Sequence, residues 1–333
     1  MSPNLAGERH TTRILQVDAA RIAEAASILL AGGLVAFPTE TVYGLGADAT
    51  DAQAIARLYE AKERPVFNPL IAHLSSIAAA REVGRFNVTA ILLAEKFWPG
   101  PLTLILPAAE NCIVCELARA ALPTVALRMP AHPAAQSLLK AAGRPIAAPS
   151  ANRSGHVSPT TADHVISDLR GRIDAVLDGG PTQLGLESTI IDCTNERPAL
   201  LRPGTISRAA IETVLGAPLA DAPSHHEGAP VAPGQLPSHY ATSAKLRLDA
   251  TEVEPGEALL AFGEPLPKDA YHAAFTLDLS PKGDLVEAAA NLFSHLRALD
   301  ATGAHSIAVA PIPRHGLGEA IRDRLMRAAA PRN

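Results

Sequence analysis

The sequence predicts an α/β protein made of a larger and a smaller domain, and three observations support this prediction. The chain has 333 residues, which corresponds to about two domains at roughly 150 residues each. Hydrophobic residues make up 47% of the chain and charged residues 19%, so we expect a folded core rather than disorder. Short apolar runs alternate with amphipathic segments along the chain, as in a sheet covered by helices.

Helices are expected where apolar residues recur at helical spacing. The first covers residues 19–30 and is stopped by Gly32-Gly33. Further helices are expected before residue 216, at 51–62, 75–83, 87–97, 133–142, 161–170 and 207–215.

Strands are expected in the short apolar runs between these helices. They are the runs at 34–37, 70–73, 102–106, 125–128, 146–148, 175–177, 188–192 and 199–201. Several of these strands follow one another without an intervening helix, so we expect a mixed sheet. Gly44-Leu45-Gly46 lacks the third glycine of a dinucleotide-binding fingerprint and is expected to form a turn.

Residues 217–243 interrupt the alternation of strands and helices. They contain five prolines and few large apolar residues, which is typical of a linker. We therefore divide the chain into a first domain at 13–216, a linker at 217–243 and a second, smaller α/β domain at 244–333. The second domain has apolar runs at 258–262, 273–277 and 306–310 and helical patterns at 284–300 and 316–329.

Charge and composition exclude several classes of protein. The formal net charge of −5 gives no basic field that would draw the chain onto nucleic acid or an anionic membrane. The longest apolar run, residues 28–37, contains two glycines and is too short to span a bilayer. The three cysteines, and an N-terminus without the apolar core of a signal peptide, suit a reducing compartment. We expect a cytoplasmic protein without membrane contact.

The common catalytic and metal-binding motifs are missing from the sequence. It contains no GxxxxGK[ST] phosphate loop and no GxSxG nucleophile elbow. Cys112 and Cys115 form a single CxxC, whereas zinc would require a second pair of ligands at a compatible spacing. We therefore expect no metal ligand from protein side chains.

Polar clusters lie instead beside successive expected strands. These clusters are residues 38–44, 62–65, 128–130, 149–155 and 187–189. Ligands bind at strand ends in open α/β sheets, so we expect the clusters to converge on one cleft. Lys62, Arg64 and Arg128, together with several hydroxyl and amide donors, suit an anionic, phosphate-bearing ligand. A single cluster could equally be a helix cap or a surface ion pair, but five in succession favour a ligand site.

The same clusters resemble, in order, the motifs of the threonylcarbamoyl-AMP synthase, or YrdC-like, family. The matching segments are residues 36–46, 62–65, 68–70, 98–103, 126–130, 148–152, 187–190 and 201–204. The resemblance covers residues 13–216 nearly continuously, apart from 108–123. Residues 232–234 and 238–240 resemble the linker of the longer members, although Ala241 stands where these commonly have a proline. The resemblance implies a twisted mixed sheet in the first domain and a Rossmann-like second domain.

The resemblance also implies an activity, that of a nucleotidyltransferase. Such an enzyme joins L-threonine, bicarbonate and ATP into L-threonylcarbamoyladenylate and releases pyrophosphate. Partner transferase proteins then use this product to make threonylcarbamoyladenosine in ANN-decoding tRNAs, so any contact of this chain with tRNA is expected to be weak or indirect. Mg²⁺ is expected to bridge the phosphates, and no tightly bound cofactor is expected.

Roles for individual residues follow from the matching motifs. The residues expected to be catalytic are Lys62, Arg64, Ser150 and Asn152. The residues expected to contact ATP are Arg64, Asn68, Thr124, Ser150, Ser158, Arg202 and Tyr240. The residues expected to line the threonine pocket are Thr41, His73, Arg128, Ala148 and Ser188.

Two of these expectations also have a chemical reason. The planar fork of Arg128 matches a carboxylate, so it is expected to clamp that group of threonine. Tyr240 is a large aromatic residue in a polar linker, so it either anchors the linker on a domain or contacts a ligand. The resemblance favours a linker that folds over the cleft as a lid, with Tyr240 near the nucleotide.

Three other functions remain open from the sequence. A carbamoyl-adenylate module like those of hydrogenase-maturation proteins shares the Lys-x-Arg and Ser-x-Asn pattern, but this chain lacks their acylphosphatase and zinc-finger segments. A double-stranded RNA-binding protein would need more basic charge than residues 1–216 offer, with 19 basic and 20 acidic residues. A non-catalytic module that binds ATP or threonine for regulation would release no pyrophosphate.

Overall fold

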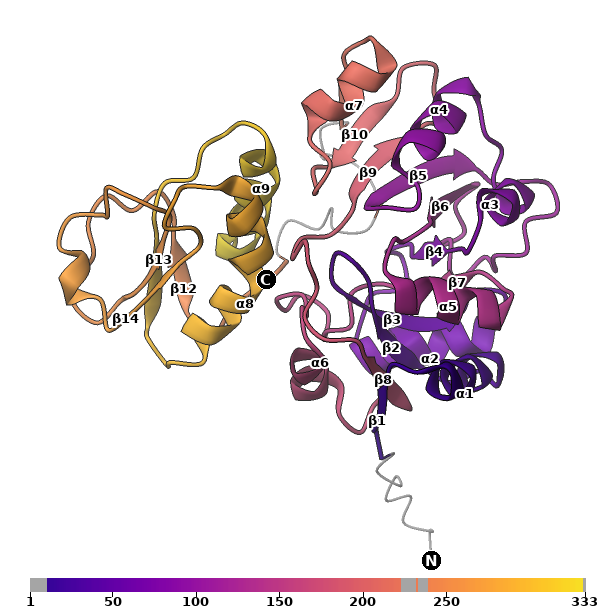
Figure 1. The fold of residues 1–333 in the computed structure, drawn as a ribbon, viewed down its shortest axis with the longest axis horizontal. Helices are drawn as coiled ribbons and strands as arrows, with labels where there is room; N and C mark the ends of the chain where they lie inside the picture. The colour runs from indigo at the N-terminus through magenta and orange to yellow at the C-terminus, as the bar shows by residue number, and fades with distance from the viewer. Residues whose placement is uncertain (1–10, 223–231, 233–238, 332–333) are drawn as a thin grey trace, which may run out of the picture.

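The structure, a computed structural model, describes residues 11–222, 232 and 239–331. Figure 1 shows two bodies side by side, a larger one built on a long sheet and a smaller one from the C-terminal part of the chain. The large sheet contains both parallel and antiparallel pairs, and the small sheet is parallel throughout. The predicted α/β class with a mixed first sheet is confirmed.

Within the described residues, eleven strands form the large sheet, in the order β1-β8-β2-β3-β7-β4-β6-β5-β9-β10-β11. In chain order they are β1 (Arg13–Gln16), β2 (Val35–Pro38), β3 (Tyr43–Asp48), β4 (Ile71–His73), β5 (Leu102–Pro107), β6 (Thr124–Arg128), β7 (Ile146–Ala147), β8 (Ala175–Asp178), β9 (Thr189–Asp192), β10 (Ala199–Arg202) and β11 (Ala220–Asp221). The strand β11 lies inside the segment predicted as a linker and pairs with β10.

The helices of this part of the chain lie close to their predicted ranges. They are α1 (Ala19–Leu30), α2 (Ala52–Lys62), α3 (Ile77–Val83), α4 (Val88–Phe97), α5 (Pro133–Ala142), α6 (Ala162–Leu169) and α7 (Arg208–Leu215). Side-chain caps explain where several helices begin. At the start of α2, the carboxylate of Asp51 accepts a hydrogen bond from the amide of Gln53. At the other end of α2, Glu63 adopts a left-handed conformation with φ 54° and ends the helix.

The turn predicted at Gly44-Leu45-Gly46 is wrong, because these residues lie within β3. This strand pairs with β2 in an antiparallel hairpin, and Gly46 lies opposite Val35. A Cβ at Gly46 would lie 2.9 Å from the ring of Phe37, so the glycine leaves room for this ring beside the neighbouring strand. The actual turn is Thr39–Val42, where the Thr39 hydroxyl donates to the carbonyl of Val42.

The C-terminal domain has a four-stranded parallel sheet in the order β12-β15-β13-β14. Its strands are β12 (Lys245–Arg247), β13 (Ala258–Ala261), β14 (Phe275–Asp278) and β15 (Ser306–Val309). The helices α8 (Leu285–Asp300) and α9 (Leu317–Ala329) lie between this sheet and the large domain (Figure 1). The parallel sheet and its crossover helix α8 confirm the smaller α/β domain.

The two domains share one apolar core along α8 and α9. Val42, Leu186 and Tyr240 belong to the same buried cluster as Phe293 and Ile321 of these helices. Ion pairs cross the same boundary, namely Arg297 with Asp168, Arg208 with Glu319 and Arg324 with Glu187. The second domain is therefore packed firmly against the first.

A close approach between the domains depends on Gly185. A Cβ at this position would lie 2.4 Å from the carbonyl oxygen of Ala290 in α8. Because the contacted atom belongs to the backbone, this clash can be relieved only if the backbone moves. Gly180 makes a matched control, because its φ of 78° resembles the 68° of Gly185 but a Cβ added there would meet no atom within 4 Å.

We predict that Gly185→Ala destabilises the folded protein by about 1–3 kcal/mol more than Gly180→Ala, since both carry backbone strain but only one is overpacked. Chemical denaturation of the two variants measures this difference. Equal losses of stability in the two variants would show that the backbone of α8 can move away from residue 185 without loss of folding free energy.

Candidate active site

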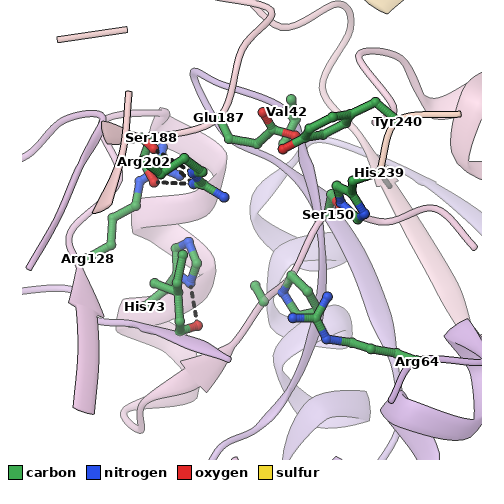
Figure 2. Close-up of a pocket in the computed structure, with 13 residues that line it drawn as sticks. Val42, Arg64, His73, Arg128, Ser150, Glu187, Ser188, Arg202, His239 and Tyr240 are labelled. Carbon is green, nitrogen blue, oxygen red and sulfur yellow. Dashed lines mark hydrogen bonds between the residues drawn. The ribbon is translucent and has the colours of Figure 1, made fainter. Parts of the chain in front are cut away.

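A cavity lies on the large domain where it meets residues 239–240 (Figure 2). Three buried arginines line it, Arg64, Arg128 and Arg202, so the cavity is suited to anionic ligands. Its lining residues are Val42, Arg64, Ile71, His73, Arg128, Ala148, Pro149, Ser150, Glu187, Ser188, Arg202, His239 and Tyr240.

The cavity lies over one face of the central strands rather than only beyond their ends. Ile71 and His73 are two residues apart on β4 and therefore point to the same face. The neighbouring parallel strand β6 places Arg128 opposite His73. On the opposite face of these strands, Ala72 and Leu127 belong to the main apolar core. The polar clusters converge as predicted, but a sheet face forms the floor of the cavity.

Most of the predicted site residues are brought together here. The predicted residues that line the cavity are Arg64, His73, Arg128, Ala148, Ser150, Ser188, Arg202 and Tyr240. The predicted residues that hydrogen-bond a lining residue from behind the wall are Thr41, Lys62, Asn68 and Ser158. Asn152 lies one contact further back, where its carbonyl accepts from Lys62. Thr124 does not line the cavity. It shares the β6 face with Arg128 but lies at the start of that strand.

Figure 2 shows Arg128, Ser188 and Arg202 together on one side of the cavity, and Arg64, Ser150 and His239 on the other. On the first side, Nη2 of Arg128 donates to Oε1 of Glu40 at 2.7 Å and to the Thr41 hydroxyl at 2.9 Å. The other oxygen of Glu40 accepts from the amide of Ala131. One arm of the guanidinium is therefore held within the protein, and Glu40 fixes the orientation of Arg128.

Ser188 is held by two neighbours on the same side. Its hydroxyl is 2.8 Å from that of Thr103, and Arg202 donates to both its hydroxyl and its carbonyl oxygen. Burial lowers the pKa of Arg202 to about 10. Arg202 was predicted as an ATP contact, and in this structure its hydrogen bonds orient Ser188.

His73 is neutral in the folded protein. Burial, together with the charge of Arg128, lowers the pKa of His73 to about 3. Its Nδ1 lies 3.1 Å from the carbonyl of Ile71, which can only accept, so Nδ1 carries the proton. His73 thus offers its other ring nitrogen as a hydrogen-bond acceptor.

On the second side, Lys62 supports the loop that carries Ser150 and Asn152. Its ammonium donates to the carbonyl of Ser150 at 2.6 Å and to that of Asn152. Burial, followed by the charge of Arg64, holds the pKa of Lys62 well below its usual value. The ammonium group expected on the triphosphate is therefore used here to fix the backbone behind the cavity.

Several buried polar atoms on this side have no hydrogen-bond partner in the described part of the chain. They are Nε of Arg64, Oδ1 of Asn68, Oδ1 of Asn152 and Nδ1 of His239. An unpartnered buried polar atom costs about 1–3 kcal/mol. Arg64 and His239 line the cavity, where a bound ligand would supply partners for their nitrogens.

Tyr240 anchors its segment on the second domain and also lies at the cavity. Its ring stacks on Phe293 of α8 at 5.3 Å between ring centres, and it also lines the cavity. His239 lies edge-on against the same ring at 4.3 Å. The rest of the predicted lid, residues 223–231 and 233–238, lies outside the described residues.

Three residues at or just behind the cavity wall had no role assigned from the sequence: Glu40, Glu187 and His239. Each stands next to an assigned residue, namely Thr41, Ser188 and Tyr240, and that adjacency is the available signal. The sequence does not show which cation neutralises each of the two carboxylates. The structure shows that Arg128 pairs with Glu40 and Arg324 with Glu187.

The described ranges contain neither a metal cage nor a membrane-spanning helix. In them, no group of three or more His, Cys, Asp and Glu side chains is arranged to hold a metal ion. Cys112 and Cys115 are free thiols. None of the helices formed by described residues is both long and apolar enough to cross a membrane.

Two family models together match almost the whole chain. The model described as "Telomere recombination" matches residues 27–204. The model described as "Threonylcarbamoyl-AMP synthase, C-terminal domain" matches residues 206–330.

Curated relatives and solved structures agree with these models. A threonylcarbamoyl-AMP synthase of Bacillus subtilis is 40% identical over 331 residues, covering 96% of this chain and 95% of the relative. Its counterpart in Pyrococcus abyssi is 42% identical, covering 94% and 95%. The crystal structure of Pyrococcus abyssi Sua5 complexed with L-threonine matches with a TM-score of 0.87 at 40% identity, covering 96% of this chain and 98% of that one.

The neutral His73 predicts a pH dependence of stability. In the unfolded chain a histidine binds a proton near pH 6.5, whereas folded His73 does so only near pH 3. Between these values the unfolded state binds more protons, so this residue lowers stability as the pH falls.

We predict that His73→Asn makes the free energy of unfolding less dependent on pH between 5.5 and 4.5, by about 1.4 kcal/mol per pH unit. Urea denaturation at a series of pH values measures both slopes. Parallel slopes for the two proteins would mean that His73 is charged in the folded state.

Proposed function

The chain belongs to the threonylcarbamoyl-AMP synthase family, and on that basis we propose that its cavity joins L-threonine, bicarbonate and ATP into L-threonylcarbamoyladenylate. Pyrophosphate and water are the other products. The observation that carries the proposal is the set of three buried arginines that line one cavity, Arg64, Arg128 and Arg202. The double-stranded RNA-binding alternative is not favoured, because the likeness to synthases extends over both domains.

The chemistry requires positioning rather than a protein nucleophile. The threonine nitrogen attacks the carbon of bicarbonate, and one oxygen leaves as water while the nitrogen loses a proton, which gives a carbamate. With CO₂ derived from bicarbonate, the same carbamate forms by loss of the amine proton alone. A carbamate oxygen then attacks the α-phosphorus of ATP, and the bond to pyrophosphate breaks. Both steps are accelerated by holding the reactants together and by neutralising developing negative charge.

The proposed threonine pocket is the side of the cavity around Arg128, with the residues Thr41, His73, Arg128, Ala148 and Ser188. The part of the Arg128 guanidinium that Glu40 does not hold would contact the carboxylate. The acceptor nitrogen of neutral His73 and the Ser188 hydroxyl suit the amino and hydroxyl groups of threonine.

The proposed ATP pocket lies around Arg64. Its contacts are Arg64, Asn68, Ser150, Asn152, Ser158, Arg202 and Tyr240, with Lys62 holding the loop that carries two of them. Thr124 lies farther along the β6 face, and we propose that the nucleoside extends in that direction. Arg64 and Arg202 are the cations proposed to neutralise the phosphates.

We propose that Mg²⁺ enters with ATP, bridging and partly neutralising its phosphate oxygens. The donors at the cavity fit this arrangement. Glu40 and Glu187, the carboxylates beside it, are both engaged by arginines, while the free polar atoms suit phosphate and ribose. Protein side chains would thus hold the phosphates rather than the ion.

Downstream, we propose that transferase proteins take the threonylcarbamoyl group from the adenylate to tRNA. With 19 basic and 20 acidic residues in positions 1–216, this domain is expected to contact tRNA weakly or indirectly.

The function is tested by incubating the full chain with ATP, Mg²⁺, bicarbonate and each amino acid in turn. Mass spectrometry should detect threonylcarbamoyladenylate, and pyrophosphate release should require both threonine and bicarbonate. ATP or threonine binding without this product would instead indicate a regulatory module.

We predict that Arg64→Ala lowers kcat/KM for ATP by a hundredfold or more, because one cationic contact to a transferring phosphoryl group contributes on the order of 3 kcal/mol. Lys62→Ala should lower the rate comparably through the loop at 149–152. Arg57→Ala, an exposed change on the same helix, is the control. If Arg64→Ala and Lys62→Ala both keep more than a third of the wild-type rate, Arg64 and Lys62 do not belong to the active site.

We predict that serine is the best substitute for threonine and that valine is very poor. A pocket that hydrogen-bonds a hydroxyl rejects an analogue without one, because buried polar groups are then left unpaired. Competition assays with the three amino acids measure this preference. If valine reacts as well as serine, the hydroxyl group is not recognised.

A further inference from the structure

The C-terminal domain reaches the wall of the cavity through Arg324 of α9. This arginine is fully buried, with a relative exposure of 0%. Its Nε donates to Oε2 of Glu187 at 3.0 Å, and its Nη1 donates to the carbonyl of Pro203 at 2.7 Å. Asp323 provides a second carboxylate for Nη1. A side chain of the second domain thereby neutralises an acid that lines the cavity of the first.

Glu187 links Arg324 to the proposed ATP pocket. Its Oε1 accepts a hydrogen bond from the Ser158 hydroxyl at 2.6 Å, while its Oε2 is held by Arg324. Both oxygens of one carboxylate are thus fixed, one by each domain. Any movement of Arg324 would release Glu187 and, with it, the orientation of Ser158.

The guanidinium of Arg324 also lies over the ring of Tyr240, at 5.6 Å from the ring centre. Phe293 of α8 also supports this ring, by stacking on it. A cation over an aromatic face is attractive, so Arg324 helps to hold Tyr240 at the cavity. Two walls of the ATP side therefore depend on one side chain that does not itself line the cavity.

Glu187 is negatively charged, so it must be paired with Arg324 if the cavity is to bind an anion. An uncompensated carboxylate at the cavity wall would repel the phosphates that Arg64 and Arg202 are placed to attract. Stability of the fold alone does not explain the pair, because an apolar residue of similar volume generally stabilises a core as well as a buried ion pair does.

We propose that Arg324 is a positioning residue for the ATP side of the active site, acting through Glu187 and Tyr240. The inference rests on the proposed synthase function. It makes the C-terminal domain a structural part of nucleotide binding, since α9 supplies the cation that pairs directly with Glu187.

The test compares steady-state KM values for ATP and for threonine in full-length variants. Arg324→Met, which keeps volume and removes charge, should raise KM for ATP about tenfold while KM for threonine stays within about twofold. Arg324→Lys should recover part of the loss. Glu319→Gln is the matched control, because it breaks the Arg208 ion pair between the same two domains on the same helix.

A double variant separates positioning from packing. If Arg324 compensates Glu187, adding Glu187→Gln to Arg324→Met should lower KM for ATP again by about threefold or more. A purely structural role predicts no such recovery. Circular dichroism and thermal unfolding verify the fold of each variant. If Arg324→Met does not fold, the comparison of Arg324→Lys with Glu319→Gln carries the test.

A KM for ATP within twofold of the wild type in folded Arg324→Met, or in Arg324→Lys if only that variant folds, would overturn the inference. Equal increases in KM for ATP in Glu319→Gln and in Arg324→Met, or in Arg324→Lys if only that variant folds, would also overturn it, because they would show only general loosening of the domain boundary. If the wild-type chain makes no threonylcarbamoyladenylate, the proposed function itself fails, and this outcome is distinct from both.

Discussion

Keeping several cations buried around one cavity is the constraint on which the rest of this structure depends. Lys62, Arg64, Arg128 and Arg202 are each at most 8% exposed. Removing such charges from water is costly unless carbonyls or carboxylates solvate them. The protein meets this cost with backbone carbonyls and with carboxylates that pair inside the wall, so the charges are fixed before a ligand arrives.

The large sheet makes this solvation possible. Its central strands bring residues far apart in the sequence to one face, with His73 opposite Arg128 across β4 and β6. The loop after β7 supplies the carbonyls that hold Lys62. Such a preorganised set of donors and charges stabilises developing negative charge without rearranging during the reaction.

The smaller domain supports the wall of the cavity with its own side chains. Phe293 and Arg324 support Tyr240 from α8 and α9, and Arg324 also reaches Glu187. This arrangement explains why an aromatic residue in a polar linker is fully buried: it is held between the cavity and the second apolar core.

The sequence by itself determined the α/β class, most helices and strands, and the clusters that form the cavity, because periodicity, caps and local motifs depend on neighbouring residues. It did not show that Gly44 and Gly46 lie in a strand, since glycine alone favours turns and only the close packing of Gly44 against Ala148 and of Gly46 against Phe37 explains them. Nor did it show which charges neutralise one another. The pairing of Arg324 with Glu187 joins residues 137 positions apart, and only the tertiary structure decides such pairs, because their energy depends on distance and burial.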